Sequence, residues 1–117
     1  MDIKQALIDF GVDYEDAMTR FLDDEDFYQE FLVKFTEDPF TNELKAALEA
    51  SNTEEAFKLA HTLKGLCANF GFTPLLEFMK PLVEILRQGS LEGANELFEK
   101  YYDKYSALCK IIHTYCK

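Results

Sequence analysis

The residues best suited to chemistry are His61, Lys64 and Gly65, which lie within one short stretch of the chain. In a helix, side chains three and four positions apart share a face, so Lys64 would follow His61 by one turn with Gly65 beside it. A neutral imidazole is a competent nucleophile near neutral pH. An ammonium group can balance the charge of phosphoryl oxygens. Because a glycine leaves the approach open, this combination predicts a carrier of phosphoryl groups.

The apolar residues around this motif predict a helix that buries one side and leaves the motif beside the core. The apolar positions that repeat with the helical period are Ala56, Leu59, Ala60, Leu63, Leu66, Cys67 and Phe70. His61 follows Ala60 by about 100° around the helix axis, so we expect the imidazole to be at least partly open to solvent. The adjoining face consists of Phe57, His61, Lys64, Gly65 and Ala68.

Each of these residues also has a simpler explanation. A single histidine on a helix is usually a surface or partly packed residue, and a glycine inside a helix can serve close packing. A second function class is therefore a non-catalytic helical adaptor that docks a partner through the face around Phe57 and Ala68. A third is an enzyme with a histidine nucleophile, which ranks last because no second catalytic group or cofactor motif accompanies His61.

Length, charge and cysteine content exclude several other classes. The chain has 117 residues and a net charge of −10, with no basic patch for nucleic acid or for an anionic membrane surface. Its apolar runs are shorter than the ~20 residues of a membrane span. Three cysteines and no apparent targeting segment favour a reducing compartment. We expect one domain over residues 1–117 that is cytoplasmic, monomeric and free of cofactors.

The hydrophobic pattern is helical along the whole chain, and glycine, proline and capping residues divide it. We expect Pro39 to kink one long helix and Pro81 to bend or break another. We expect Thr53, Thr73 and Ser90 to act as N-caps, and Gly71 to end a helix in the left-handed conformation. The predicted segments run from Ile3 to Phe10, from Asp13 to Leu22, from Asp26 to Ala50, from Thr53 to Gly71, from Thr73 to Gly89 and from Ser90 onward.

The connections after Ala50, Gly71 and Gly89 are short. Short connections place successive helices side by side and antiparallel. The predicted fold is therefore all-α, an antiparallel up-down four-helix bundle with the N-terminal helical segment covering one end.

A second candidate site, for a metal ion, lies near the C-terminus. Cys109, His113 and Cys116 share one side of the last predicted helix, and these residue types can hold Zn²⁺. Three ligands on one helix make an incomplete structural site, however, and buried thiols also serve as small apolar residues. We therefore predict no metal.

The chain resembles histidine-containing phosphotransfer (HPt) domains over most of its length. The motif that carries the resemblance is His61-Thr62-Leu63-Lys64-Gly65, followed by Asn69-Phe70-Gly71-Phe72 and Leu75. The likeness extends upstream to Arg20-Phe21-Leu22 and to Phe27-Tyr28 through Phe35, and downstream to Leu86-Arg87-Gln88-Gly89. Residue types, spacing and helical context agree in this motif.

The resemblance implies a phosphorelay intermediate. His61 would be the phosphoacceptor, Lys64 would contact the phosphoryl group, and Gly65 would leave room for a response-regulator receiver domain. The chain would exchange phosphate with the aspartates of receiver domains or take it from a hybrid histidine kinase, and the partner would supply Mg²⁺. With no ATP-binding motif in the sequence, it would not be a kinase. Arg87 is either a second cation near the site or an ordinary surface arginine.

One position departs from the family pattern. Many HPt domains use a Gln or Glu on the following helix to hydrogen-bond the acceptor histidine, and the motif places that position at Val83 here. Lys80, about one turn earlier, also differs from the usual residue. A shift of the helix at Pro81 could bring Glu84 into the role instead.

Overall fold

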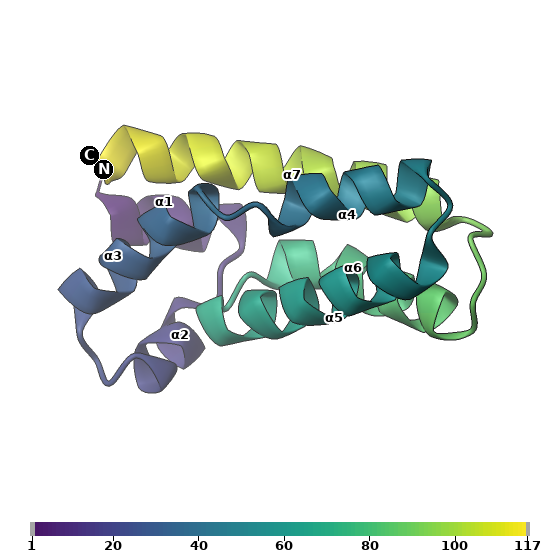
Figure 1. Cartoon of the computed structure of the whole chain (residues 1–117). Helices are drawn as coiled ribbons and strands as arrows, with labels where there is room; N and C mark the ends of the chain where they lie inside the picture. The colour runs from purple at the N-terminus through teal and green to yellow at the C-terminus, as the bar shows by residue number, and fades with distance from the viewer. Residues whose placement is uncertain (1, 117) are drawn as a thin grey trace.

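The computed structural model describes residues 2–116, and the described chain consists of helices joined by short turns (Figure 1). The helices are α1 (Ile3–Phe10), α2 (Tyr14–Arg20), α3 (Glu25–Thr36), α4 (Phe40–Glu49), α5 (Thr53–Phe70), α6 (Thr73–Arg87) and α7 (Ala94–Tyr115). No strand occurs within residues 2–116, which confirms the all-α prediction.

Helices α4 to α7 form an antiparallel four-helix bundle in which each helix packs beside the next along the chain (Figure 1). The contacts of α5 with α6 and of α6 with α7 are the most extensive, and α4 also touches α7. Helices α1, α2 and α3 gather at one end, where α1 and α3 pack on α7 and α2 packs on α5. The predicted bundle with an N-terminal cover is confirmed.

Short polar side chains begin several of the helices. Asp2, Asp13, Asp24 and Asn52 each accept a hydrogen bond from a backbone N–H of the first helical turn, which would otherwise lack a partner. The prediction that Thr53 caps α5 is wrong, because Asn52 holds that place one residue earlier. Gly71 ends α5 in the left-handed conformation, as predicted.

The segment predicted as one kinked helix from Asp26 to Ala50 is two helices, α3 and α4. Pro39 has no N–H to donate to the preceding turn, and it disfavours helical geometry at Asp38. The Asp38 carboxylate instead accepts a hydrogen bond from the backbone N–H of Phe40 at 2.7 Å. The break lets α3 pack against α2 and α7 while α4 joins the bundle.

The break predicted as one effect of Pro81 does not occur, because α6 continues through this residue. Pro81 and Glu77, whose carbonyl loses its helical donor, both lie on the exposed side of α6, where water can replace the missing bond. Two predicted caps also shift. Phe72, and not Thr73, is the residue that precedes α6. Gly93 precedes α7. Ser90 caps only the turn before α7, where its hydroxyl accepts a hydrogen bond from the Glu92 N–H.

Aromatic side chains fill the end of the bundle nearest α3. The rings of Phe35, Phe70 and Phe72 lie 5.0–5.7 Å apart between centroids. The buried Tyr28 hydroxyl donates to the Phe70 carbonyl at 2.7 Å. Leu22, the last residue of the helical segment predicted from Asp13, is 84% exposed because the chain turns away from the core after Phe21 with a positive φ at Leu22.

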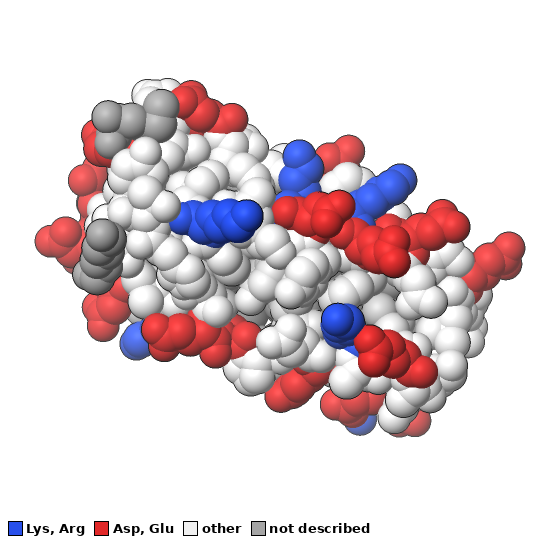
Figure 2. All heavy atoms as spheres, turned by 90° about the horizontal axis from the view of Figure 1, so that it is seen from above, with Lys and Arg blue, Asp and Glu red and all other residues white. Residues whose placement is uncertain are grey.

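The surface is predominantly acidic, as the net charge of −10 requires. Figure 2 shows carboxylates spread around the face seen from above, with a few basic side chains between them. Among residues 2–116, no helix is both long enough and apolar enough to cross a membrane.

Candidate functional site

The predicted reactive residues lie on the middle of α5, on a side that is largely open to solvent. His61 is exposed, Lys64 one turn later is half-buried, and Gly65 is exposed. A Cβ atom built on Gly65 would meet nothing within 4 Å. Close helix packing therefore does not explain this glycine, and the surface above it is open to another molecule.

A groove of about 520 Å³ runs along this side of α5. His61, Lys64, Gly65 and Ala68 contribute its floor from α5. Asp13, Asp16 and Arg20 border it from the start and the body of α2, and Leu76 and Lys80 border it from α6. The structure thus brings four of the predicted site residues together in one hollow.

The other two predicted residues, Phe57 and Arg87, lie outside the groove on the opposite side of His61. The Phe57 ring is 5.8 Å from the imidazole between centroids. The Arg87 guanidinium lies over the same Phe57 ring at 5.1 Å, which is within cation–π range. The Phe57 ring therefore lies between Arg87 and the histidine. The sequence alone did not decide whether Arg87 lies near the site.

The environment of the imidazole differs from the usual family pattern. Val83 is 0% exposed and packs in the core. Glu84, the alternative orienting residue, is exposed and pairs with Arg87 at 3.4 Å. Within residues 2–116, no hydrogen bond to the His61 ring is found, and its described ring contact is with Phe57. The imidazole therefore lies beside an aromatic ring, tilted by 44° to it, in place of the Gln or Glu partner that the resemblance implies.

The sequence reasoning missed the contribution of α2 to the groove. Arg20 was noted only as part of an upstream resemblance, and Asp16 was not singled out. The Arg20 Nε donates to the Asp16 carboxylate at 2.9 Å, and its Nη1 donates to Asn69 Oδ1 at 3.1 Å. The spacing of four between Asp16 and Arg20 predicts an ion pair on a helix, but nothing local predicts the contact with α5.

A family model for the Hpt domain matches residues 26–114. The chain belongs to the Hpt domain family. The match includes α4 to α7 and the motif around His61, whereas α1 and α2 precede it. No curated protein and no solved structure matches the chain. Hpt domains serve phosphorelays as phosphocarriers without kinase activity of their own, and they typically interact with receiver domains.

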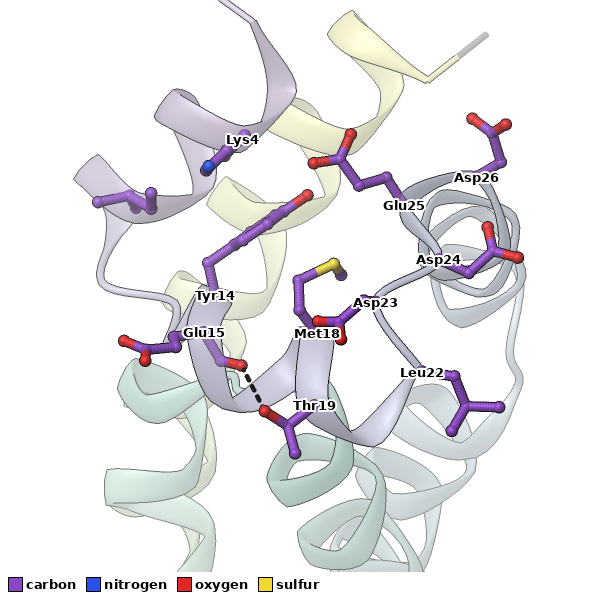
Figure 3. A pocket seen from close by; sticks show the side chains of 11 residues that line it. Lys4, Tyr14, Glu15, Met18, Thr19, Leu22, Asp23, Asp24, Glu25 and Asp26 are labelled. Carbon is purple, nitrogen blue, oxygen red and sulfur yellow. Dashed lines mark hydrogen bonds between the residues drawn. The ribbon is translucent and has the colours of Figure 1, made fainter.

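A larger hollow of this Hpt domain, with a volume of about 1090 Å³, lies elsewhere, at the corner between α1, α2 and α3. Figure 3 shows Lys4, Tyr14 and Glu25 pointing into it, with three further acidic side chains near Glu25 at the start of α3. Burial, followed by the charges of Glu25 and Asp2, raises the pKa of the Tyr14 hydroxyl. Because this hollow is strongly acidic, it is a poor place for a phosphoryl group.

The cysteine and histidine side of α7 does not form a metal site in the described residues. The His113 Nε2 is hydrogen-bonded to the Thr36 hydroxyl at 3.0 Å. Burial raises the pKa of both Cys109 and Cys116, which disfavours the thiolates that a metal requires. Across residues 2–116, no group of three or more His, Cys, Asp or Glu side chains is placed to hold a metal ion.

Proposed function

We propose that His61 accepts a phosphoryl group and exchanges it with the aspartate of a response-regulator receiver domain. The observation that carries this proposal is an exposed imidazole with Lys64 one helical turn away and open space above Gly65. The same face continues into the groove, so a partner domain can approach the ring without any rearrangement of α5.

The transfer needs little chemistry from this chain. The lone pair of a ring nitrogen of His61 attacks the phosphorus of an aspartyl phosphate, an N–P bond forms, and the aspartate carboxylate leaves with the electrons of the broken O–P bond. The reverse step uses the same geometry. The ammonium group of Lys64 balances the charge on the phosphoryl oxygens, and such charge balance together with alignment accounts for most of phosphoryl-transfer catalysis.

The partner supplies the rest of the active site. Gly65 leaves the space into which the receiver's acidic phosphorylation site would dock, with Phe57, Ala68 and Arg87 at the margins of contact. The donor is a receiver domain, either free or as part of a hybrid histidine kinase. We expect the chain to act as a monomer.

Phosphate transfer to His61→Gln tests this proposal. Purified chain is incubated with receiver domains of the host that have been phosphorylated with radiolabelled acetyl phosphate. Wild type should acquire a base-stable, acid-labile label, and His61→Gln should acquire none while keeping its helical circular dichroism and melting temperature. His113→Gln is the matched control, because it removes the other histidine at the far end of α7, and it should be labelled like wild type.

Equal labelling of wild type and His61→Gln would reject His61 as the acceptor. Receiver binding without any labelling of wild type would favour the adaptor hypothesis instead.

A further inference from the structure

The groove beside His61 has a wall that the family match does not include. Helix α2 precedes residue 26, yet Asp16 and Arg20 border the same hollow as His61 and Lys64. Arg20 is held there from two sides, by the Asp16 carboxylate on its own helix at 2.9 Å and by the Asn69 side chain near the end of α5 at 3.1 Å. The guanidinium is therefore positioned before any partner arrives.

The charge of this groove is opposite to that of the whole protein. Arg20, Lys64 and Lys80 border it together with Asp13 and Asp16, so with a neutral imidazole it carries one net positive charge. The chain as a whole carries −10. A local positive potential on an acidic protein directs an anionic partner surface to one place and hinders its approach elsewhere.

The Arg20 side chain keeps capacity for a partner. About half of it is exposed, at 47% of its side-chain surface, and its two described hydrogen bonds use Nε and one hydrogen of Nη1. A guanidinium presents further N–H donors in a planar fork that suits carboxylate and phosphoryl oxygens. Because its partners already restrict the side chain, binding would cost less conformational entropy than for a free arginine.

We propose that Arg20 is a docking residue of α2 that attracts the anionic phosphorylation site of the receiver domain, and that Asp16 moderates this attraction. The inference rests on the proposed function, because it concerns the partner of the same groove. It adds a positioned arginine, from outside the family-matched stretch, to the face around His61. Arg20 acts on the association step and does not touch the reacting nitrogen.

A purely structural role for Arg20 is distinguishable by a pair of variants. Arg20→Gln and Asp16→Asn both remove the ion pair, and Arg20→Gln also removes the hydrogen bond to Asn69, so a structural role predicts a loss of stability in both variants and faster transfer in neither. The two substitutions change the groove charge in opposite directions, so a docking role predicts transfer effects of opposite sign. Lys34→Gln is the matched control, because Lys34 is also a surface cation paired four residues back along its helix, with Glu30, but lies outside the groove.

The experiment measures the second-order rate constant of transfer from a radiolabelled phospho-receiver to each variant, at about 50 mM and about 500 mM salt. At low salt, we expect Arg20→Gln to be slower by roughly 3- to 10-fold and Asp16→Asn to be faster by roughly 2- to 5-fold, with Lys34→Gln close to wild type. At high salt the differences should shrink, because charges at the surface are screened.

Equal slowing of Arg20→Gln and Asp16→Asn, or a loss that does not depend on salt, would overturn the docking role. Slowing of Lys34→Gln to the same extent as Arg20→Gln would also overturn it, because net charge alone would then suffice. The His61→Gln variant distinguishes failure of the inference about Arg20 from failure of the proposed function. If His61→Gln is inert while all four other proteins transfer at one rate, only the inference about Arg20 fails.

Discussion

The two sides of α5 differ in almost every physical property, although they belong to one helix. One side carries His61, Lys64 and Gly65, which are exposed or half-buried and border an open groove. The other side carries Ala56, Ala60 and other residues that are buried in the core. Packing on the buried side stabilises the helix, so the open side can carry residues that contribute little to stability.

Gly65 and Phe70 illustrate this division at the level of single residues. Gly65 disfavours the helix by about 1 kcal/mol relative to alanine and has no neighbour above it. Phe70 is 5% exposed and stacks on Phe21 and Phe72 with centroids 5.4 and 5.2 Å apart. The packing of Phe70, about one and a half turns later, stabilises the fold by more than Gly65 destabilises the helix.

The largest effect should follow from damage to the buried side. Phe70→Ala removes a ring from the aromatic cluster and leaves a cavity, so the free energy of unfolding should fall by about 3–5 kcal/mol. Urea denaturation of the purified variant measures this loss. Phe57→Ala, on the open side, should lose clearly less because Phe57 is only half-buried. Equal losses in the two variants would contradict the claim that the buried side of α5 contributes more to stability than the open side.

A smaller effect, on transfer and not on stability, should follow from filling the open side. Gly65→Leu places a branched side chain where the partner docks, so the rate of phosphate transfer should fall by at least about tenfold. The free energy of unfolding should stay the same or rise, because leucine favours the helix and its Cβ would have no neighbour within 4 Å.

Gly65→Ala is the control for helix propensity in this experiment. It should raise the free energy of unfolding by roughly 0.5–1 kcal/mol while transfer falls much less than in Gly65→Leu. Transfer at the wild-type rate in Gly65→Leu would remove the argument that Gly65 provides access for a partner.

The smallest expected effect is a decline of the free energy of unfolding at alkaline pH, caused by ionisable groups that are buried in the core. Burial raises the pKa of Cys67 from its ordinary 9.0 to about 12. The folded state therefore holds this proton when the unfolded state has lost it, so stability is complete below pH 9 and declines as pH rises toward 12. Burial also raises the pKa of Tyr28 and Tyr101, which extends the decline above pH 10.

Urea denaturation at pH 7.5, 9 and 10 would reveal this decline in the wild type. Cys67→Ala should weaken the dependence between pH 9 and 10, before most tyrosines titrate. A flat profile in the wild type over this range would show that the thiol is not sealed from solvent in the folded protein.

Local sequence patterns predicted most of the helices because their signals act over a few residues. Asp13 and Gly71 mark helix ends through hydrogen bonds and backbone geometry within one turn, and both lie where the pattern placed them. The errors arose where two local signals competed. Pro39 was expected to kink a helix but separates two, and Pro81 was expected to disturb a helix that continues because its freed carbonyl faces water.

The site divides in a similar way between local and long-range information. The spacing of His61, Lys64 and Gly65 follows from the helical repeat, so the sequence alone places them together on one side of α5 and beside the core. The contacts of Arg20 with Asn69 and of Arg87 with Phe57 join residues far apart in the chain. No short pattern encodes such pairs, because they depend on how helices pack.

The sequence by itself determined an all-α bundle and a reactive face on one helix, because hydrophobic period, caps and motif spacing are properties of neighbouring residues. Only the tertiary structure decided that α2 forms a wall of the groove and that Val83 lies in the core while Glu84 pairs with Arg87. It also decided that the described residues leave at least 4 Å free around a Cβ atom at Gly65. These facts depend on the angles and distances between helices, which the burial of many side chains sets collectively.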